Sequence, residues 1–145
     1  MAKLNILTFL ISYFLISFSV LGYGLFLEKF FEKKREIGKD LGFTGILGIF
    51  FLFLYSFISH NFISHNLIHN TFLFFIGLSL FILLFKNLDT KNNLIILSLL
   101  LLISFIGLLI YKTHDDFHYY HFPYSIYLTE HPSFLGIGQF NHGFR

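Results

Sequence analysis

The chain contains no cysteine and no tryptophan, and only 12% of its 145 residues are charged. The absence of cysteine excludes disulfides, zinc–thiolate sites, iron–sulfur clusters and cysteine nucleophiles within this chain. Neither the Gly-x-Ser-x-Gly elbow of serine hydrolases nor a phosphate-binding P-loop occurs in it. Soluble domains average about 25% charged residues, so the low share of charge argues against a globular core covered by a polar surface.

The charge that is present gives no sign of a nucleic-acid partner. The formal net charge is only +2, and no basic patch with interleaved aromatic residues occurs in a soluble context. Alanine and valine are almost absent, whereas phenylalanine, isoleucine, leucine, asparagine and lysine are abundant. This bias is typical of an AT-rich genome, which accounts for the mild excess of lysine.

Long apolar runs dominate the rest of the sequence. The mean hydropathy is +0.71, and phenylalanine alone occurs 23 times. We expect four membrane-spanning helices, at residues 4–27, 42–60, 67–85 and 94–111, and therefore an all-α polytopic bundle over residues 1–112. A cleaved signal peptide is the alternative for the first run, but that run is longer than the roughly 7–15 residues of a signal h-region.

The lysine and arginine residues predict an orientation in the membrane. Residues 28–40 carry five of them and residues 86–93 carry two, whereas the loop between the second and third runs carries none. The positive-inside rule places the two basic segments in the cytoplasm. The N-terminus and residues 113–145 then lie outside the inner membrane of a bacterium. We interpret residues 28–40 as a solvated cytoplasmic loop, with a short interfacial helix as the alternative.

Two features of the sequence predict close contacts. Gly22 and Gly24 could let neighbouring helices approach the first one closely. His60, His65 and His69 lie between the second and third runs, and His65 and His69 would share one face of a helix. Converging imidazoles can bind a metal. A polar hairpin without metal is the preferred interpretation, because no carboxylate or thiolate joins the cluster.

Residues 113–145 are rich in aromatic and polar residues and contain no run long enough to span a membrane. We expect an extracytoplasmic loop that packs on a membrane surface or on other helices. Proline is common in the first turn of a helix, so a short helix is predicted at residues 125–129, begun at Pro123.

The chemically active groups concentrate just after the fourth run. Asp115 and Asp116 are adjacent, so their side chains point in different directions and suit two distinct roles. One carboxylate could act as a general base. His114, His118 and His121 could ligate a metal, orient the base or contact a phosphate; Mg²⁺ or Mn²⁺ would favour the carboxylates and Zn²⁺ the imidazoles. The alternative is a polar loop that caps the fourth helix.

The tail also resembles a known group of proteins. It reads Thr-His-Asp-Asp-Phe-x-Tyr-Tyr-His-Phe-Pro-Tyr at 113–124, Tyr-Leu-Thr-Glu at 127–130 and Gly-x-Gly-x-Phe-Asn-His-Gly-Phe-Arg at 136–145. These motifs look like those of uncharacterised bacterial polytopic inner-membrane proteins, which are similar to GT-C glycosyltransferases. The helices match only by their apolar pattern.

The resemblance implies an enzyme that uses a lipid-linked sugar donor. Asp115 or Asp116 would be the catalytic base or contact a metal such as Mg²⁺ or Mn²⁺, and Lys112, His118 or Arg145 would contact a phosphate of the donor. The metal ligands would be Asp115, Asp116, His114 and His118.

The chain differs from the GT-C pattern in two ways. In those enzymes the acidic loop follows the first helix, whereas here it follows the fourth run, and they have more helices. We therefore expect the N-terminal part of a longer protein, inactive by itself. The alternative function is a non-enzymatic small integral membrane protein, either a structural subunit or a protein that handles divalent metals.

Overall fold

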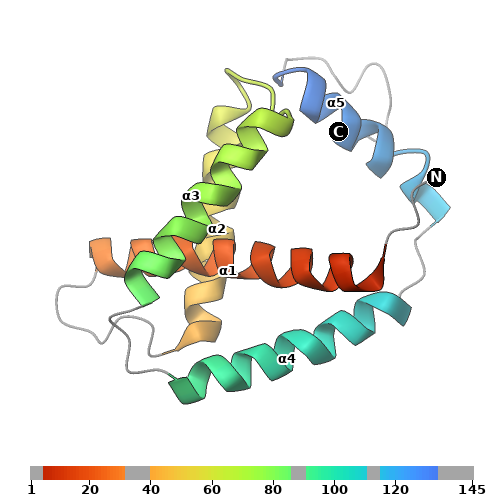
Figure 1. The fold of residues 1–145 in the computed structure, drawn as a ribbon. Helices are drawn as coiled ribbons and strands as arrows, with labels where there is room; N and C mark the ends of the chain where they lie inside the picture. Colours follow the sequence, from red (N-terminus) through yellow and green to blue (C-terminus); the bar gives the residue numbers. More distant parts are fainter. Residues whose placement is uncertain (1–4, 32–39, 86–90, 111–114, 134–145) are drawn as a thin grey trace. The chain divides into compact units, whose positions relative to one another are not determined.

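The computed structural model describes residues 5–31, 40–85, 91–110 and 115–133, and every regular element in them is helical (Figure 1). This confirms the predicted all-α fold class. The elements are α1 (Ile6–Phe31), α2 (Leu41–Ser59), α3 (Leu67–Phe85), α4 (Lys91–Ile110), the short 3₁₀ helix η1 (Asp115–Phe117) and α5 (His121–Glu130). The chain forms two compact units, the first from Met1–Phe53 and Phe74–Ile110, the second from Leu54–Leu73 and Tyr111–Arg145.

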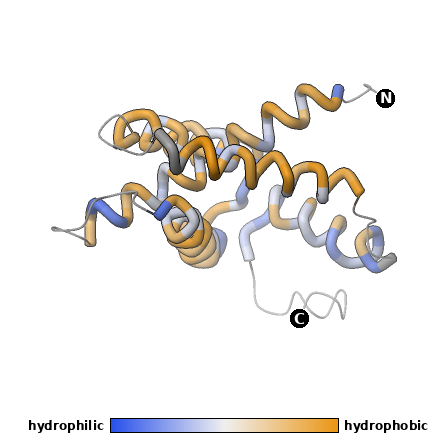
Figure 2. The backbone as a smooth tube through the Cα atoms, turned by 90° about the horizontal axis from the view of Figure 1, so that it is seen from below, coloured by the Kyte–Doolittle hydropathy of each residue, from blue (hydrophilic) through white to orange (hydrophobic). Residues whose placement is uncertain are grey.

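Three of these helices, α1, α2 and α3, are long and apolar enough to cross a membrane. Their sequences are almost entirely apolar, and Figure 2 shows hydrophobic residues over most of the helical backbone. The fourth predicted run coincides with α4, whose apolar part, Leu94–Ile110, is shorter than the other three. The predicted bounds agree with α2 and α3 to within a residue, whereas α1 continues past residue 27 to Phe31.

Side-chain amides and carboxylates start the three long helices. Asn5 accepts a hydrogen bond from the N–H two residues later at 3.2 Å. Asp40 accepts from the N–H groups two and three residues later at 3.0 and 3.1 Å. Asn66 accepts from the N–H three residues later at 3.0 Å. Each satisfies N–H groups that have no partner within the helix, so the polar residues between the runs fix where α1, α2 and α3 begin.

The long helices direct most of their large apolar side chains outward. Ile46 and Ile103 are each 65% exposed and Ile49 is 62% exposed. The buried apolar cluster of the first unit is small and centres on Leu21 and Leu25 of α1. A soluble protein exposes few contiguous apolar patches of this kind. The arrangement is the one expected where lipid, and not water, surrounds the helices.

Glycine residues join α1 to α2 and α3 within the first unit. A Cβ atom on Gly24 would overlap the backbone carbonyl of Thr44 in α2, and one on Gly22 would overlap the carbonyl of Gly77 in α3. Gly48 of α2 lies equally close to the backbone of α1. The predicted role of Gly22 and Gly24 in close helix approach is confirmed, because only a residue without a side chain fits at these crossings.

Glu28 corrects the expected start of the first polar loop. We placed it in a solvated segment, but it lies within α1 and is only 7% exposed. Its carboxylate is within hydrogen-bond distance of the hydroxyl of Thr44, which is fully buried. The partner on α2 lets the carboxylate stay inside the packed helices, so α1 extends a turn further than its apolar run. Residues 32–39, where the interfacial helix was the alternative, lie outside the described residues.

The tail contains more helix than predicted. The short helix expected at residues 125–129 is α5, which begins at His121, before Pro123. Proline fits there because the first four N–H groups of a helix have no partner within it. The 3₁₀ helix η1 precedes α5 and was not predicted.

Candidate functional site

The three hairpin histidines of the second unit lie in contact with one another. The ring of His65 stacks on that of His69 with their centroids 4.4 Å apart and their planes 7° apart. The ring of His60 meets His65 edge-on, with centroids 4.6 Å apart and an interplanar angle of 88°. The hairpin between α2 and α3 therefore brings the imidazoles together, as the sequence suggested. Their contacts are ring stacking and edge-to-face packing.

Hydroxyl groups of α2 occupy both nitrogens of His65. Its Nδ1 lies 3.2 Å from the hydroxyl of Ser56, and its Nε2 lies 2.9 Å from that of Ser59. A serine hydroxyl can donate or accept, so either neutral tautomer of His65 satisfies both contacts.

The ring of His69 has a hydrogen-bond partner at each nitrogen. Its Nδ1 lies 3.1 Å from the amide oxygen of Asn70, which can only accept, so Nδ1 carries the proton. The Nε2 atom lies 3.0 Å from the Tyr55 hydroxyl, within hydrogen-bond distance. The Tyr55 ring also stacks on the imidazole, with centroids 5.8 Å apart. Because Asn70 also donates to the carbonyl of His65 at 2.8 Å, its amide orientation is determined as well.

His60 connects the hairpin to the tail. It is 4% exposed, and its Nε2 donates to the carbonyl of Leu128 in α5 at 2.9 Å. Its Nδ1 is hydrogen-bonded to the hydroxyl of Ser133. The Ser133 N–H donates in return to the carbonyl of His60 at 2.8 Å, and the His65 N–H donates to the carbonyl of Leu128 at 3.1 Å. Four hydrogen bonds thus hold the segment from α5 to Ser133 against the hairpin.

These bonds bear on the metal hypothesis for the hairpin. All six ring nitrogens of His60, His65 and His69 already have a protein partner. Among the side chains that the structure describes, no three His, Asp or Glu residues form a group that could hold a metal. The hairpin is polar, and the ring nitrogens of its imidazoles bond to neighbouring hydroxyl, amide and carbonyl groups.

The surroundings of His65 lower the pKa of its imidazole. Burial lowers the pKa of His65 below its ordinary value of 6.5, and the nearby His69 and His60 lower it further. His65 lies between α2 and α3, outside the apolar helices. The folded hairpin therefore favours the neutral imidazole.

The acidic pair lies on η1, shortly before α5. The backbone carbonyl of Asp116 accepts from the N–H groups of Tyr119 and Tyr120 at 3.1 and 2.9 Å, which fixes the turn. The side chains of Asp116 and His118 are both exposed. The side chain of Asp115 lies outside the described residues. So do Lys112, His114 and Arg145, and their predicted roles remain predictions.

Sequence reasoning missed two features. The first is the attachment of the hairpin to Leu128 and Ser133: the repeated Ser-His-Asn pattern marked the histidines, but a backbone carbonyl acceptor has no sequence signature. The second is Lys29, which was assigned to a basic loop and instead lines a pocket with α3. Its only signal in the sequence is its position at the end of an apolar run.

No protein-family model, curated protein or solved structure matches the chain. Over the described residues, the fold and the site define a class: an all-helical protein with three helices able to span a membrane and a second unit in which the hairpin histidines are hydrogen-bonded to the tail. Function has to be argued from these features.

Proposed function

We propose that the chain is a bacterial inner-membrane protein and the N-terminal part of a GT-C-like glycosyltransferase, to which it contributes an acidic extracytoplasmic turn. The observation that supports this most directly is the hydrogen-bonded part of the tail, residues 115–133. The exposed carboxylate of Asp116 lies on a fixed turn just before α5, and α5 is held to the hairpin by His60 and His65. A catalytic group placed on such a rigid support can be positioned accurately against a substrate.

The contact between hairpin and tail also supports the proposed topology. The hairpin precedes α3, and the tail follows α4. Segments that share hydrogen bonds lie on one side of a membrane, so the chain between them crosses it an even number of times. This favours α4 as a fourth span. The lysine and arginine distribution then favours the extracytoplasmic side of the inner membrane for hairpin and tail.

In the proposed reaction, a carboxylate removes the proton from an acceptor hydroxyl. The acceptor oxygen bonds to the anomeric carbon of the sugar while the bond from that carbon to the phosphate oxygen breaks, and the lipid phosphate leaves with the electron pair. Asp116 has the exposure that this role needs. Lys112, His118 and Arg145 are the proposed phosphate contacts.

A divalent ion is compatible with the same turn. Mg²⁺ is commonly held by one or two carboxylates together with substrate phosphates, so Asp115 and Asp116 have suitable chemistry, with His114 and His118 as further proposed ligands. When bound, Mg²⁺ or Mn²⁺ would neutralise charge on the departing phosphate.

The test is transfer from a polyprenyl-phosphate-linked radiolabelled sugar in membranes that contain the protein expressed from its intact gene. Asp116→Asn and Asp115→Asn keep the side-chain shape and remove the base or metal contact. We expect at least one to lower the rate about 10²–10⁴-fold. Glu130→Gln, at an exposed carboxylate on α5, is the matched control and should leave the rate unchanged.

The alternative is a non-enzymatic membrane protein, and one observation favours it. The hairpin imidazoles use all their nitrogens on neighbouring groups, as a structural element does. Full transfer activity in both aspartate variants, or no transfer by the wild type, would assign the chain to this alternative. Asp116 would then be a polar residue of a capping turn.

A further inference from the structure

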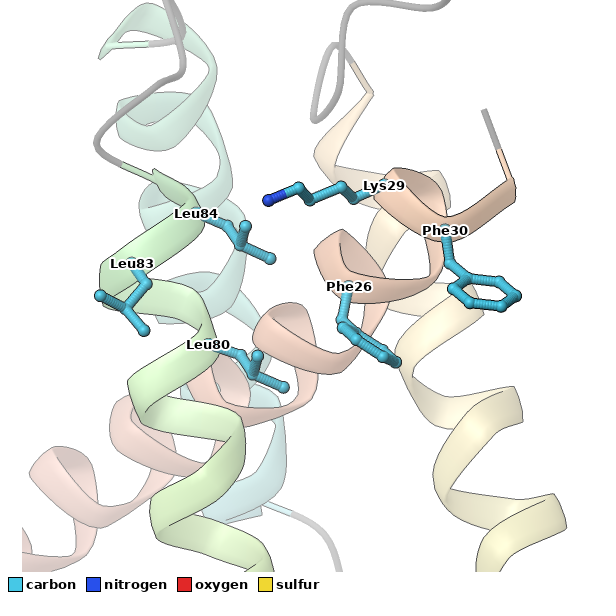
Figure 3. A pocket seen from close by; sticks show the side chains of 6 residues that line it. All are labelled: Phe26, Lys29, Phe30, Leu80, Leu83 and Leu84. Atoms are coloured by element: carbon cyan, nitrogen blue, oxygen red, sulfur yellow. The ribbon is translucent and has the colours of Figure 1, made fainter. Parts of the chain in front are cut away.

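A pocket of about 500 Å³ lies between the C-terminal ends of α1 and α3 in the first unit (Figure 3). It is lined by one cation and five apolar residues, namely Lys29, Phe26, Phe30, Leu80, Leu83 and Leu84. Figure 3 shows the Lys29 side chain extended across the gap, with its amine near the end of α3. The volume is that of an ordinary small-ligand site, and the lining is amphipathic.

The composition of this pocket points to a ligand with an anionic head and an apolar tail. Among its described lining residues Lys29 is the only charged group. The neighbouring Glu28 is directed to another partner, because its carboxylate contacts Thr44 of α2. Successive residues of a helix point about 100° apart, so the two charges face different surroundings. The pocket therefore presents a positive charge above an apolar floor.

The position of the pocket on the helices identifies the ligand class. Lys29 lies in the last turn of α1, and Leu80, Leu83 and Leu84 lie in the last two turns of α3. Both helices are long and apolar enough to span a membrane. A lysine at the end of such a helix extends its amine to the level of the lipid headgroups. The cytoplasmic leaflet, where the basic segments are predicted to lie, is rich in anionic lipid.

We propose that this pocket binds one anionic phospholipid, with the phosphate on the Lys29 amine and an acyl chain along Phe26, Leu80 and Leu83. This inference is independent of glycosyl transfer, because it concerns the end of α3 opposite to the hairpin. A different role for Lys29 is to offset the negative end of the α1 dipole. That role alone gives no preference for anionic lipid, so the two can be separated.

The absence of tryptophan makes a direct measurement feasible. Phe30→Trp places a single indole at the pocket, and Phe31→Trp places one on the next residue, which is 74% exposed and is not a lining residue. Each protein is reconstituted into vesicles of phosphatidylcholine with brominated phosphatidylglycerol or brominated phosphatidylcholine. Quenching of tryptophan fluorescence then gives the relative affinity of the two lipids at each position.

We expect phosphatidylglycerol to be preferred about fivefold at position 30, since one lysine near an anionic lipid contributes about 1 kcal/mol. Position 31 should show almost no preference. Lys29→Gln in the Phe30→Trp protein should abolish the preference, and Lys29→Arg should retain it. Lys91→Gln removes the same charge from the start of another helix and should have no effect.

Three results would overturn the proposal. Equal preference at positions 30 and 31 would indicate a general surface potential. A preference that survives Lys29→Gln would show that Lys29 does not hold the headgroup. Loss of the preference in excess inorganic phosphate would assign the site to a free anion instead of a lipid. The Lys29→Arg variant checks that a loss in Lys29→Gln comes from charge and not from misfolding.

Discussion

The two units of the molecule hold their segments together by opposite means. In the first unit, α1 packs closely against α2 and α3 at three glycine residues, Gly22, Gly24 and Gly48. In the second, the hairpin meets the tail through polar side chains, above all His60. Contacts of the first kind depend on volume. Contacts of the second kind depend on hydrogen bonding and protonation.

The largest effect should come from adding one methyl group to a helix crossing. Gly24→Ala places a Cβ on the carbonyl of Thr44, and backbone cannot move aside as a flexible side chain can. We expect a loss of about 3 kcal/mol in the free energy of unfolding, the upper end for overpacking. Denaturation in mixed detergent micelles, followed by circular dichroism, measures it.

Gly107→Ala is the matched control, because a Cβ there meets nothing within 4 Å. It should leave stability unchanged or raise it slightly, since alanine favours helix more than glycine does. Equal stabilities of the Gly24 and Gly107 variants would show that the close crossing does not hold α1 and α2 together.

A smaller effect is expected when the link in the second unit is removed. His60→Ala takes away the donor to Leu128 and the partner of Ser133. We expect the tail to be destabilised by about 1–3 kcal/mol, the usual range for buried hydrogen-bonding groups left unpaired. Amide hydrogen exchange should become faster at His65 and Ser133, whose N–H groups bridge the two segments.

His121→Ala is the control for that experiment, because His121 is an exposed histidine on α5. Exchange at His65 and Ser133 should remain slow in this variant. If His60→Ala also left their exchange unchanged, the tail would be held by something other than the hairpin imidazoles.

The smallest effect concerns acid. The pKa of His65 is lower in the folded chain than its ordinary 6.5, so the unfolded chain binds the proton more readily. Stability from this group is fully present above pH 6.5 and is lost as the pH falls from there through the lower, folded pKa. Protection of the hairpin amides should decrease over that range.

The first unit offers an internal comparison for this titration. Amides at the crossing of α1 and α3, where Gly22 meets the carbonyl of Gly77, should show no matching change between pH 7 and pH 5, because the atoms that approach Gly22 belong to no histidine or carboxylate. His65→Gln should remove most of the pH dependence of the hairpin. Persistence of that dependence in the variant would assign it to another group, such as His60 or His69.

The sequence by itself determined the helices. A run such as residues 67–85 can satisfy its backbone in lipid only as a helix, and Asp40 and Asn66 mark the adjacent starts by capping. It also indicated Gly22 and Gly24 as contact points, although not their partners. The acidic turn was predicted as a candidate site from its residue types, and its catalytic role stays a prediction.

Only the tertiary structure decided which polar groups are satisfied and by what. The sequence predicts that Glu28 is a loop residue, whereas in the structure it lies beside Thr44 of α2. From the sequence His60 is an interfacial histidine, whereas in the structure its Nε2–H donates a hydrogen bond to the carbonyl of Leu128. The sequence predicts that Lys29 belongs to a basic loop, whereas in the structure it lines a pocket together with residues of α3. In each case the partner is distant in the sequence. Local patterns record which groups need a partner, and the fold alone supplies it.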